Sequence, residues 1–322
     1  MIAKPERLDI ANLHFSRLCG RYLNRTSENE MLARRSKTRG NTTRMYRLRT
    51  LDTGETSINF PDLFFQKDCK TIKLEKKIRV VRMPLHIGRT IKFVSVKEHN
   101  ALSFGQRLAS LFCASAALRS LSGAATLLQE GYAIARPVAA VEDRRWGVLI
   151  TSFYISEEIT GAKTIADYWR EDLLDRKGTE GQLRRRRVAT KLARLFKSLH
   201  ERKIYHNDLK AANILAFDKG PAAEEILNLI DLQGVRKCYY LSRRRRIKNL
   251  AQINRTLGNH LTPKEKLTFL QAYVGDGIFA RRKKRHLVRS ILKETSRQMT
   301  REKMRHRPAE NQPFFEITSP AH

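Results

Sequence analysis

Apolar positions along the chain change their spacing near Gly161. Before that residue, short segments rich in β-branched residues predict strands. These segments are IRVVRMPL (78–85), TIKFVSVKE (90–98), ARPVAAVED (135–143) and VLITSFYISEEI (148–159). Between the second and the third segment, residues 103–130 repeat apolar positions at helical spacing and predict one long helix, which Gly131 is placed to end. The first part of the chain is therefore expected to run strand, strand, helix, strand, strand.

Beyond Gly161 the spacing is mainly helical. Residues 181–203 place Val188, Leu192, Leu195, Phe196 and Leu199 on one helical face. Further helices are predicted over residues 164–174, 242–260 and 262–275, and short strands over residues 214–215 and 228–230. A small β-rich lobe followed by a larger helical lobe is an α+β, two-lobed architecture.

Composition divides the chain into four parts. Residues 1–60 are basic and polar without a clear period, and we expect a loosely ordered extension there. The β-rich lobe is predicted over residues 61–158 and the helical lobe over residues 159–290. Residues 291–322 are predicted to form a polar C-terminal tail.

The net charge narrows the choice of partner. Among 322 residues, 64 are Lys or Arg and 32 are Asp or Glu, which gives a formal charge of +32. Such a charge favours nucleic acid, an acidic membrane surface or a phosphorylated substrate. The chain carries no recognisable RNA or DNA module, and with 8% aromatic residues it offers no evident stacking platform, so nucleic acid is the least favoured.

The cysteines and the apolar stretches exclude other classes of protein. The four cysteines lie far apart and form no CxxC pair, so we expect reduced thiols and neither a zinc site nor a disulfide framework. The N-terminal stretch MIAKPERLDIANLHF lacks the apolar core of a signal peptide. No stretch approaches the roughly 18 apolar residues of a membrane span, so we expect any membrane contact at the surface.

One constellation carries chemistry. In YHNDLKAANIL (205–215), His206, Asp208 and Asn213 form the pattern H-x-D-x-x-x-x-N, and Asp231 follows in LIDLQG. Phosphoryl transfer from ATP needs such a set. Asp208 is the candidate base that accepts the proton of the acceptor hydroxyl. Asn213 and Asp231 are the candidate ligands of Mg²⁺, which prefers hard oxygen donors.

Two further residues of the loop have expected roles. Lys210 is a candidate to neutralise the transferring phosphoryl group, and His206 is expected to support the loop by hydrogen bonds. The pattern alone also fits a polar turn, because it occurs often by chance. The position of Asp231 and the β-rich lobe upstream favour a kinase site.

The nucleotide also needs contacts from the first lobe. Lys97, in the strand-like FVSVKEH, is the candidate clamp for the α- and β-phosphates, and the alternative is a surface lysine like the nearby Lys92. The adenine is expected at the junction of the lobes, beside backbone groups from Glu157 to Ile159. The predicted cofactors are therefore ATP and Mg²⁺.

Several stretches together resemble the lipopolysaccharide core kinase family, the Kdo kinases and heptose kinases, which have a protein-kinase-like fold. The stretches are VKEHN with FCASAALRSLSGAATLLQEGY and ARPVAA, SFYISEEITGAKTIADYW, YHNDLKAANIL, LIDLQGVR, RRRRIKNLAQINRTL and LTPKEKLTFLQAYVG. The resemblance covers roughly residues 67–275. It implies phosphorylation of a sugar hydroxyl, of Kdo or heptose, in the lipopolysaccharide inner core. It also implies an anionic glycolipid substrate (lipid A bearing Kdo or heptose) and a peripheral location on the cytoplasmic face of the inner membrane.

Four departures from protein kinases stand out. The candidate phosphate-covering turn LEKKIRV is basic and not glycine-rich, and the helix after Lys97 has no glutamate before Glu130 at its end. DLQG stands in place of DFG. The APE motif is missing after Gly234, which argues against a protein substrate.

Three basic clusters remain: Arg184–Arg187, Arg243–Arg246 and RRKKR from Arg281. Part of each run is expected to be a solvated helix face. The functional alternative is attraction to an acidic lipid surface, worth on the order of 1 kcal/mol per basic residue near the membrane. Arg243 and Arg244 are the candidate substrate contacts, because they closely follow the stretch LIDLQG that contains Asp231.

Three alternatives stay open on the sequence alone. The same fold can act on another small molecule or on a protein. The missing helix glutamate also fits a pseudokinase scaffold, although a scaffold has no need of Asp208, Asn213 and Asp231 together. A basic nucleic-acid-binding protein is the third.

Overall fold

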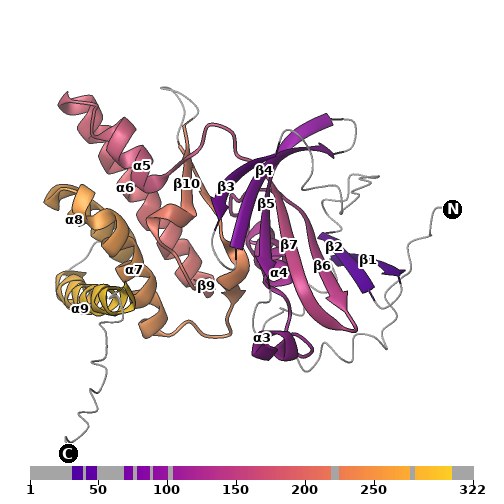
Figure 1. The fold of residues 1–322 in the computed structure, drawn as a ribbon. Helices are drawn as coiled ribbons and strands as arrows, with labels where there is room; N and C mark the ends of the chain where they lie inside the picture. The colour runs from indigo at the N-terminus through magenta and orange to yellow at the C-terminus, as the bar shows by residue number, and fades with distance from the viewer. Residues whose placement is uncertain are drawn as a thin grey trace, which may run out of the picture.

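The computed structural model describes residues 31–38, 41–48, 69–74, 78–87, 90–100, 104–218, 225–275 and 280–306. These residues form a β-sheet with a helix packed on it and a larger group of helices beside it (Figure 1). The predicted α+β architecture, with a small β-rich lobe before a larger helical lobe, is confirmed.

The small lobe is built on a seven-stranded antiparallel sheet. In spatial order its strands are β1 (Met31–Thr38), β2 (Asn41–Leu48), β6 (Pro137–Arg145), β7 (Val148–Glu157), β5 (Thr90–Asn100), β4 (Ile78–Ile87) and β3 (Lys70–Leu74). Buried residues alternate with more exposed ones in the middle of β4 and β5, which is the period of a strand with one face turned to a core. Met83, Val94 and Ile155 belong to that core.

Helix α4 (Ala116–Gln129) packs on another group of sheet residues. Its residues Ala117 and Leu121 are buried against Ala140 of β6 and Tyr154 of β7. Lys97 of β5 lies directly opposite Tyr154 in the strand register, so its side chain leaves the sheet on the face that α4 covers.

The prediction of one helix over residues 103–130 is wrong. The chain forms two helices, α3 (Phe104–Ala109) and α4, and Phe112 in the segment between them is 52% exposed. The break occurs because the Ser115 side chain accepts the backbone N–H of Leu118 at 3.1 Å and caps α4. Gly131, with φ +76°, follows the end of α4 as predicted.

Strands β1 and β2 correct the prediction of a loosely ordered extension. They form a hairpin, and β2 pairs with β6 from Asn41 opposite Arg145 to Tyr46 opposite Ala140. Backbone hydrogen bonds hold such a hairpin to the sheet, so its sequence can be charged and lack an apolar alternation. The remainder of the predicted extension, residues 1–30, 39–40 and 49–60, lies outside the described residues.

The large lobe surrounds the loop that carries the sequence motif. Its helices are α5 (Ile165–Asp167), the π-helical segment Tyr168–Leu173, α6 (Gly178–Glu201), α7 (Arg243–Leu257), α8 (Pro263–Val274) and α9 (Ala280–His306). Its short strands are β8 (Lys163–Thr164), β9 (Ile204–His206), β10 (Ile214–Phe217), β11 (Ile226–Leu229) and β12 (Val235–Lys237). Strand β10 pairs with both β11 and β8, and β9 pairs with β12.

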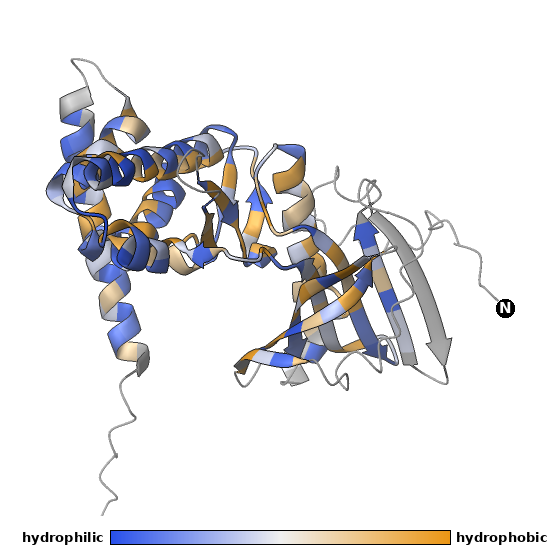
Figure 2. Ribbon diagram, turned by 90° about the horizontal axis from the view of Figure 1, so that it is seen from above, coloured by the Kyte–Doolittle hydropathy of each residue, from blue (hydrophilic) through white to orange (hydrophobic). Residues whose placement is uncertain are grey.

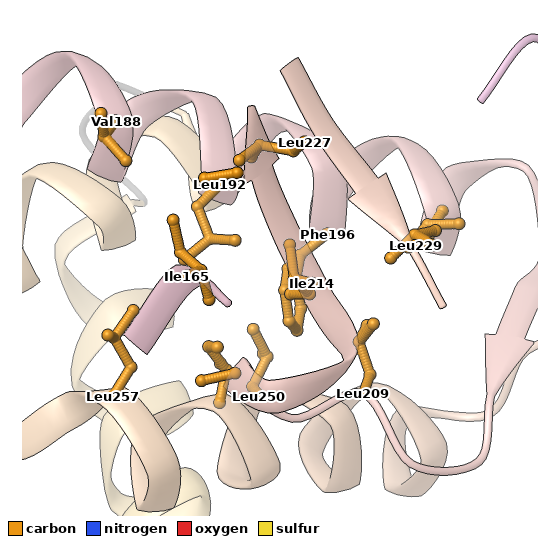
Figure 3. Packing of buried hydrophobic residues seen from close by; sticks show 14 of the residues in the cluster. Ile165, Val188, Leu192, Phe196, Leu209, Ile214, Leu227, Leu229, Leu250 and Leu257 are labelled. Atoms are coloured by element: carbon orange, nitrogen blue, oxygen red, sulfur yellow. The ribbon is translucent and has the colours of Figure 1, made fainter. Parts of the chain in front are cut away.

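One hydrophobic core ties these elements together. Figure 3 shows Leu192 and Phe196 of α6, Ile214 of β10 and Leu250 of α7 among the residues that meet there. The helices of this lobe carry hydrophobic and hydrophilic residues in turn along their length, as amphipathic helices do (Figure 2). Burial of β10 and α7 in the same core fixes the loop between β9 and β10 from both sides.

Helix α9 corrects the prediction of a polar tail from residue 291. It continues to His306, and Ile291 is buried in the core of the large lobe. The side chain of Asn254 on α7 donates to Thr295 Oγ1 at 3.1 Å. Because α9 is rich in charged residues, hydrophobic spacing did not predict its length. Residues 307–322 lie outside the described residues.

The length and hydropathy of the helices determine whether any of them could cross a membrane. No helix in the described part of the chain combines the length and the apolar character that crossing a bilayer requires.

Candidate active site

Three short strands, β9, β10 and β11, bring the motif residues together. His206 ends β9, the loop carries Asp208 and Lys210, and Asn213 closes a short 3-10 helix before β10. Strand β11 pairs antiparallel with β10 and delivers Asp231 at its end. The N–H of Ile230, the residue before Asp231, donates to the Asn213 carbonyl oxygen at 3.1 Å. Asn213 and Asp231 therefore lie side by side at the end of the β10–β11 hairpin.

His206 holds the two halves of the site in register. Its Nδ1 accepts the N–H of Asp208 at 3.2 Å, and its Nε2 lies 3.2 Å from the Ile230 carbonyl oxygen. Burial lowers the pKa of the imidazole and outweighs the hydrogen bond to Ile230, so His206 is neutral and its proton is assigned to Nε2. These contacts match the supporting role predicted for His206.

Asp208 faces two nitrogen groups of its own loop. Its Oδ2 lies 2.8 Å from Lys210 Nζ and accepts Asn213 Nδ2 at 3.1 Å. The same Asn213 nitrogen donates to the Asp208 carbonyl oxygen at 2.7 Å. The Asn213 amide nitrogen is thereby engaged, so its oxygen is the side-chain atom that could coordinate a metal. The Asp208 side chain is 39% exposed and accessible to a substrate.

Lys97 and Asp231 meet between the lobes. Lys97 Nζ donates to Asp231 Oδ1 at 2.7 Å, and both side chains are about three-quarters buried. Burial acts to raise the pKa of the Asp231 carboxyl, but the Lys97 ammonium outweighs it and the pKa is lowered. Asp231 has φ 58° and ψ 56°, a left-handed conformation that Asp tolerates better than most residues, and it turns the carboxylate toward Lys97.

Helix α4 has no acidic residue from Ala116 to Gln129 that could hold Lys97. Glu130, beyond its end, forms ion pairs with Arg202 and Lys237 instead. Asp231 thus takes the place of the missing partner. The nearby Lys92 lies elsewhere, with its Nζ 3.0 Å from both carboxylate oxygens of Glu157.

Two glycines allow close approaches around Asp231. A Cβ on Gly123 of α4 would lie 2.3 Å from the Leu232 carbonyl oxygen. A Cβ on Gly234 would lie 2.6 Å from the Cβ of Asn207, whose N–H donates to the Gly234 carbonyl oxygen at 3.1 Å. Larger residues at these positions would push the DLQG segment away from α4 and the catalytic loop.

Helix α7 holds the loop from His206 to Asn213 by hydrogen bonds that the sequence patterns did not predict. Asn249 Nδ2 donates to the His206 carbonyl oxygen at 2.6 Å, and Gln252 Nε2 donates to that of Asn207 at 2.8 Å. Thr256 Oγ1 accepts the N–H of Ala211 at 2.9 Å. These three polar residues are spaced three and four apart, so they share one helix face, and that spacing is the sequence signal that could have revealed them.

The hinge residues lie at the end of β7. The Glu157 N–H donates to the Arg136 carbonyl oxygen at 2.8 Å, and the Glu158 N–H donates to that of Phe93 at 2.9 Å. The carbonyl oxygen of Ile159 accepts the N–H of Ala162 at 3.2 Å. The predicted nucleotide contact Glu157 therefore already uses its backbone N–H in a hydrogen bond to the residue before β6.

The two predicted substrate arginines have different surroundings. Arg243 Nη2 lies 2.7 Å from His286 Nδ1 on α9. Arg244 lines an open cavity between α7 and α9. One turn further along α7, Lys248 Nζ donates to Asn207 Oδ1 at 3.1 Å, beside Asp208.

Comparison with known proteins agrees with this arrangement. A model of the lipopolysaccharide kinase (Kdo/WaaP) family matches residues 109–273, just over half of the chain, and the match includes Asp208, Asn213 and Asp231. A solved structure described as "WaaP in complex with acyl carrier protein" is similar with a TM-score of 0.53 and 21% identity, over 71% of this chain and 88% of that one. At this identity the likeness shows the fold alone. A search of curated proteins found no match. The chain belongs to the lipopolysaccharide kinase (Kdo/WaaP) family.

Proposed function

We propose that the protein is an ATP- and Mg²⁺-dependent kinase that phosphorylates a hydroxyl of Kdo or heptose in the lipopolysaccharide inner core. The observation that carries the proposal is the convergence of Lys97 from the small lobe with Asp231, Asn213 and Asp208 from the large one. Membership of a lipopolysaccharide kinase family supports the substrate class.

Asp208 is the proposed base. Its carboxylate accepts the proton of the sugar hydroxyl, whose oxygen forms the new bond to the γ-phosphorus. The bond from that phosphorus to the β–γ bridging oxygen breaks, and ADP leaves with the electron pair. Lys210 lies 2.8 Å from Asp208 and is placed to neutralise charge on the transferring group.

Asn213 and Asp231 are the proposed ligands of Mg²⁺. One amide oxygen and one carboxylate suit this hard cation. Within the described residues no group of three or more His, Cys, Asp or Glu side chains could hold a metal. In this proposal, phosphate oxygens of the nucleotide and water complete the coordination of the ion. When bound, the ion would neutralise charge that develops on the phosphates. Lys97, already within contact of Asp231, is placed to hold the α- and β-phosphates.

The adenine edge is proposed to meet the backbone at the hinge. Glu157 and Ile159 were both candidates, and the hydrogen bond from Glu157 to Arg136 favours Ile159 as the donor. Arg243 and Arg244 are proposed to attract the anionic glycolipid, lipid A carrying Kdo or heptose. Such a substrate implies work at the cytoplasmic face of the inner membrane, with the protein bound peripherally.

The test is transfer of labelled phosphate from ATP with Mg²⁺ to purified lipid A that carries Kdo. Asp208→Ala is expected to lower turnover at least about 100-fold, because the base is lost, while ATP still binds. Asp175→Ala, an exposed aspartate of the same lobe, is the matched control and should act like the wild type.

Normal turnover by Asp208→Ala would overturn the assignment of the base. If the wild type binds ATP but transfers nothing to this acceptor, the second candidate function gains support, namely a kinase for another small molecule or protein, or a pseudokinase scaffold. Transfer to alternative sugars would then separate these two.

A further inference from the structure

A second basic site lies next to the catalytic loop. An open cavity of about 620 Å³ is lined by the start of α7 with the residues just before it and by one face of α9. Figure 1 shows these two helices side by side in the large lobe, with α7 on the side of α9 that faces the short strand β9. The lining residues are Tyr240, Ser242, Arg244, Arg245, Lys248, Glu294, Arg297 and Arg301.

The charge of this α7–α9 cavity is strongly positive. Five of its side chains are cationic and one is acidic, and the acid, Glu294, accepts Gln298 Nε2 at 3.2 Å. Across the parts of the chain that the structure describes, none of the five cations forms an ion pair with a carboxylate. Elsewhere in the same lobe, arginines such as Arg184 and Arg255 do have acidic partners. The cavity therefore carries an excess of positive charge that no ion pair among the described residues neutralises.

The N-terminus of α7 adds hydrogen-bond donors and positive charge to this cavity. Ser242 caps the helix, with its side chain accepting the N–H of Arg245 at 3.4 Å, and the first turn of α7 contains no acidic residue. The N-terminus of a 15-residue helix carries a partial positive charge. Arginine forks and a helix N-terminus together suit a phosphate group, and the volume leaves room for the sugar that bears it.

The cavity is coupled to the catalytic loop. Lys248 lines the cavity and also donates to Asn207, the residue before Asp208. The guanidinium of Arg245 and the ammonium of Lys248 lie 5.3 and 5.9 Å from the centre of the Tyr205 ring, two residues before Asn207. A group bound in the cavity is thus close enough to Asp208 to belong to the molecule whose hydroxyl reacts.

We infer that the α7–α9 cavity binds a phosphate monoester that the acceptor glycolipid already carries. The inference rests on the proposed function, and it adds that the enzyme recognises an earlier phosphorylation of its acceptor. A reaction that places a phosphate monoester on the glycolipid must therefore precede this one.

The test compares two acceptors, Kdo-bearing lipid A and the same molecule after enzymatic removal of its phosphate monoesters, both in neutral detergent micelles. The wild type should show a KM at least about tenfold lower for the phosphorylated acceptor, as expected for charged hydrogen bonds. Arg297→Gln with Arg301→Gln should reduce this preference to less than about threefold. Arg282→Gln with Arg289→Gln removes the same charge from exposed positions of α9 outside the cavity and should keep the preference.

Direct binding of the two acceptors to the same three proteins separates this inference from the proposed function. Phosphate-dependent binding that only the Arg297, Arg301 variant loses, without transfer by the wild type, would support the cavity and reject this glycolipid as the acceptor of phosphoryl transfer. Transfer with equal preference in all three proteins would overturn the cavity. Equal losses in both variants would also overturn it, because they indicate attraction by net charge. The assay is also run in anionic vesicles in place of neutral micelles. If KM then falls equally for both acceptors, the cavity binds membrane phospholipid and the inference is overturned.

Discussion

The chain contains four consecutive arginines twice, and the structure uses the two runs in opposite ways. In the first run, Arg184–Arg187 of α6, the first two side chains are turned into the protein and paired with acids. In the second run, Arg243–Arg246 of α7, Arg244 and Arg245 line an open cavity with other cations. The difference arises from what packs against each helix, since the runs themselves are the same.

Arg184, the first residue of the first run, is buried and paired with acidic residues. It is 6% exposed, and it donates to Glu225 at 2.9 Å and to Asp218 at 2.6 Å. Its Nη2 also donates to the Tyr168 hydroxyl at 3.0 Å. Asp218 and Glu225 flank the link between β10 and β11, so this arginine serves the fold and is not available to a lipid surface.

The largest expected effect is on stability at Arg184. Arg184→Gln leaves the buried carboxylate of Glu225 unpaired, and removal of one partner of a buried pair costs about 3–5 kcal/mol. Urea denaturation followed by circular dichroism measures the free energy of unfolding. Arg187→Gln, an exposed member of the same run, is the control and should stay within about 0.5 kcal/mol of the wild type. Equal stabilities of the two variants would remove the distinction within this run.

The second prediction concerns Arg185, which is less completely enclosed. Its Nε donates to Glu265 at 2.8 Å and its Nη1 to the Leu173 carbonyl oxygen at 2.9 Å. Arg185→Gln should lower the free energy of unfolding by about 1.5–3 kcal/mol, the range for hydrogen bonds to charged groups. A double-mutant cycle with Glu265→Gln should show coupling between the two sites, and strictly additive losses would contradict the pairing.

The third prediction concerns pH and the end of the helix that carries the first run. Burial lowers the pKa of His200 from 6.5 to about 4. The unfolded chain binds a proton at this residue below about pH 6.5 and the folded protein does not, so stability falls as the pH is lowered toward 4. Between pH 7 and pH 5 the loss from His200 is about 2 kcal/mol. The unfolding free energies of the wild type and His200→Gln should converge by that amount, and parallel curves would reject a neutral buried His200.

The smallest expected effect on stability is in the second run. Arg244→Gln should change the free energy of unfolding by less than about 0.5 kcal/mol, because the side chain is exposed and pairs with no described carboxylate. It should nevertheless raise KM for the glycolipid severalfold. A variant as unstable as Arg184→Gln would show that the two runs are alike after all.

Local patterns predicted the features that depend on nearby residues. The strands β4 and β5, the helix α6 and the loop from His206 to Asn213 follow from period and motif over short stretches. The contact of Lys97 with Asp231 joins residues 134 positions apart, and the sequence could not name that partner because it depends on how the lobes meet. The same limit applies to the two arginine runs.

The sequence patterns also failed to predict elements that are held by backbone pairing or are rich in charged residues. The hairpin of β1 and β2 is attached along β6 by main-chain pairing, and Met45 and Tyr46 of β2 pack against the cores of the small lobe, so the sequence of the hairpin shows no sustained apolar alternation. Helix α9 packs through few apolar residues, among them Ile291. The cavity could not be predicted either, because Arg244 and Arg297 come from separate helices.

The basic residues of strand β1 affect whether copies of the protein associate in solution. Strand β1 pairs with β2 along its length, and among the described strands it forms one edge of the sheet. The edge of a sheet is a template for pairing with a second molecule, and β1 contains Arg34, Arg35 and Lys37. Like charges on two such edges repel each other, so we expect β1 to oppose edge-to-edge aggregation at low ionic strength and to lose that effect as salt screens the charges.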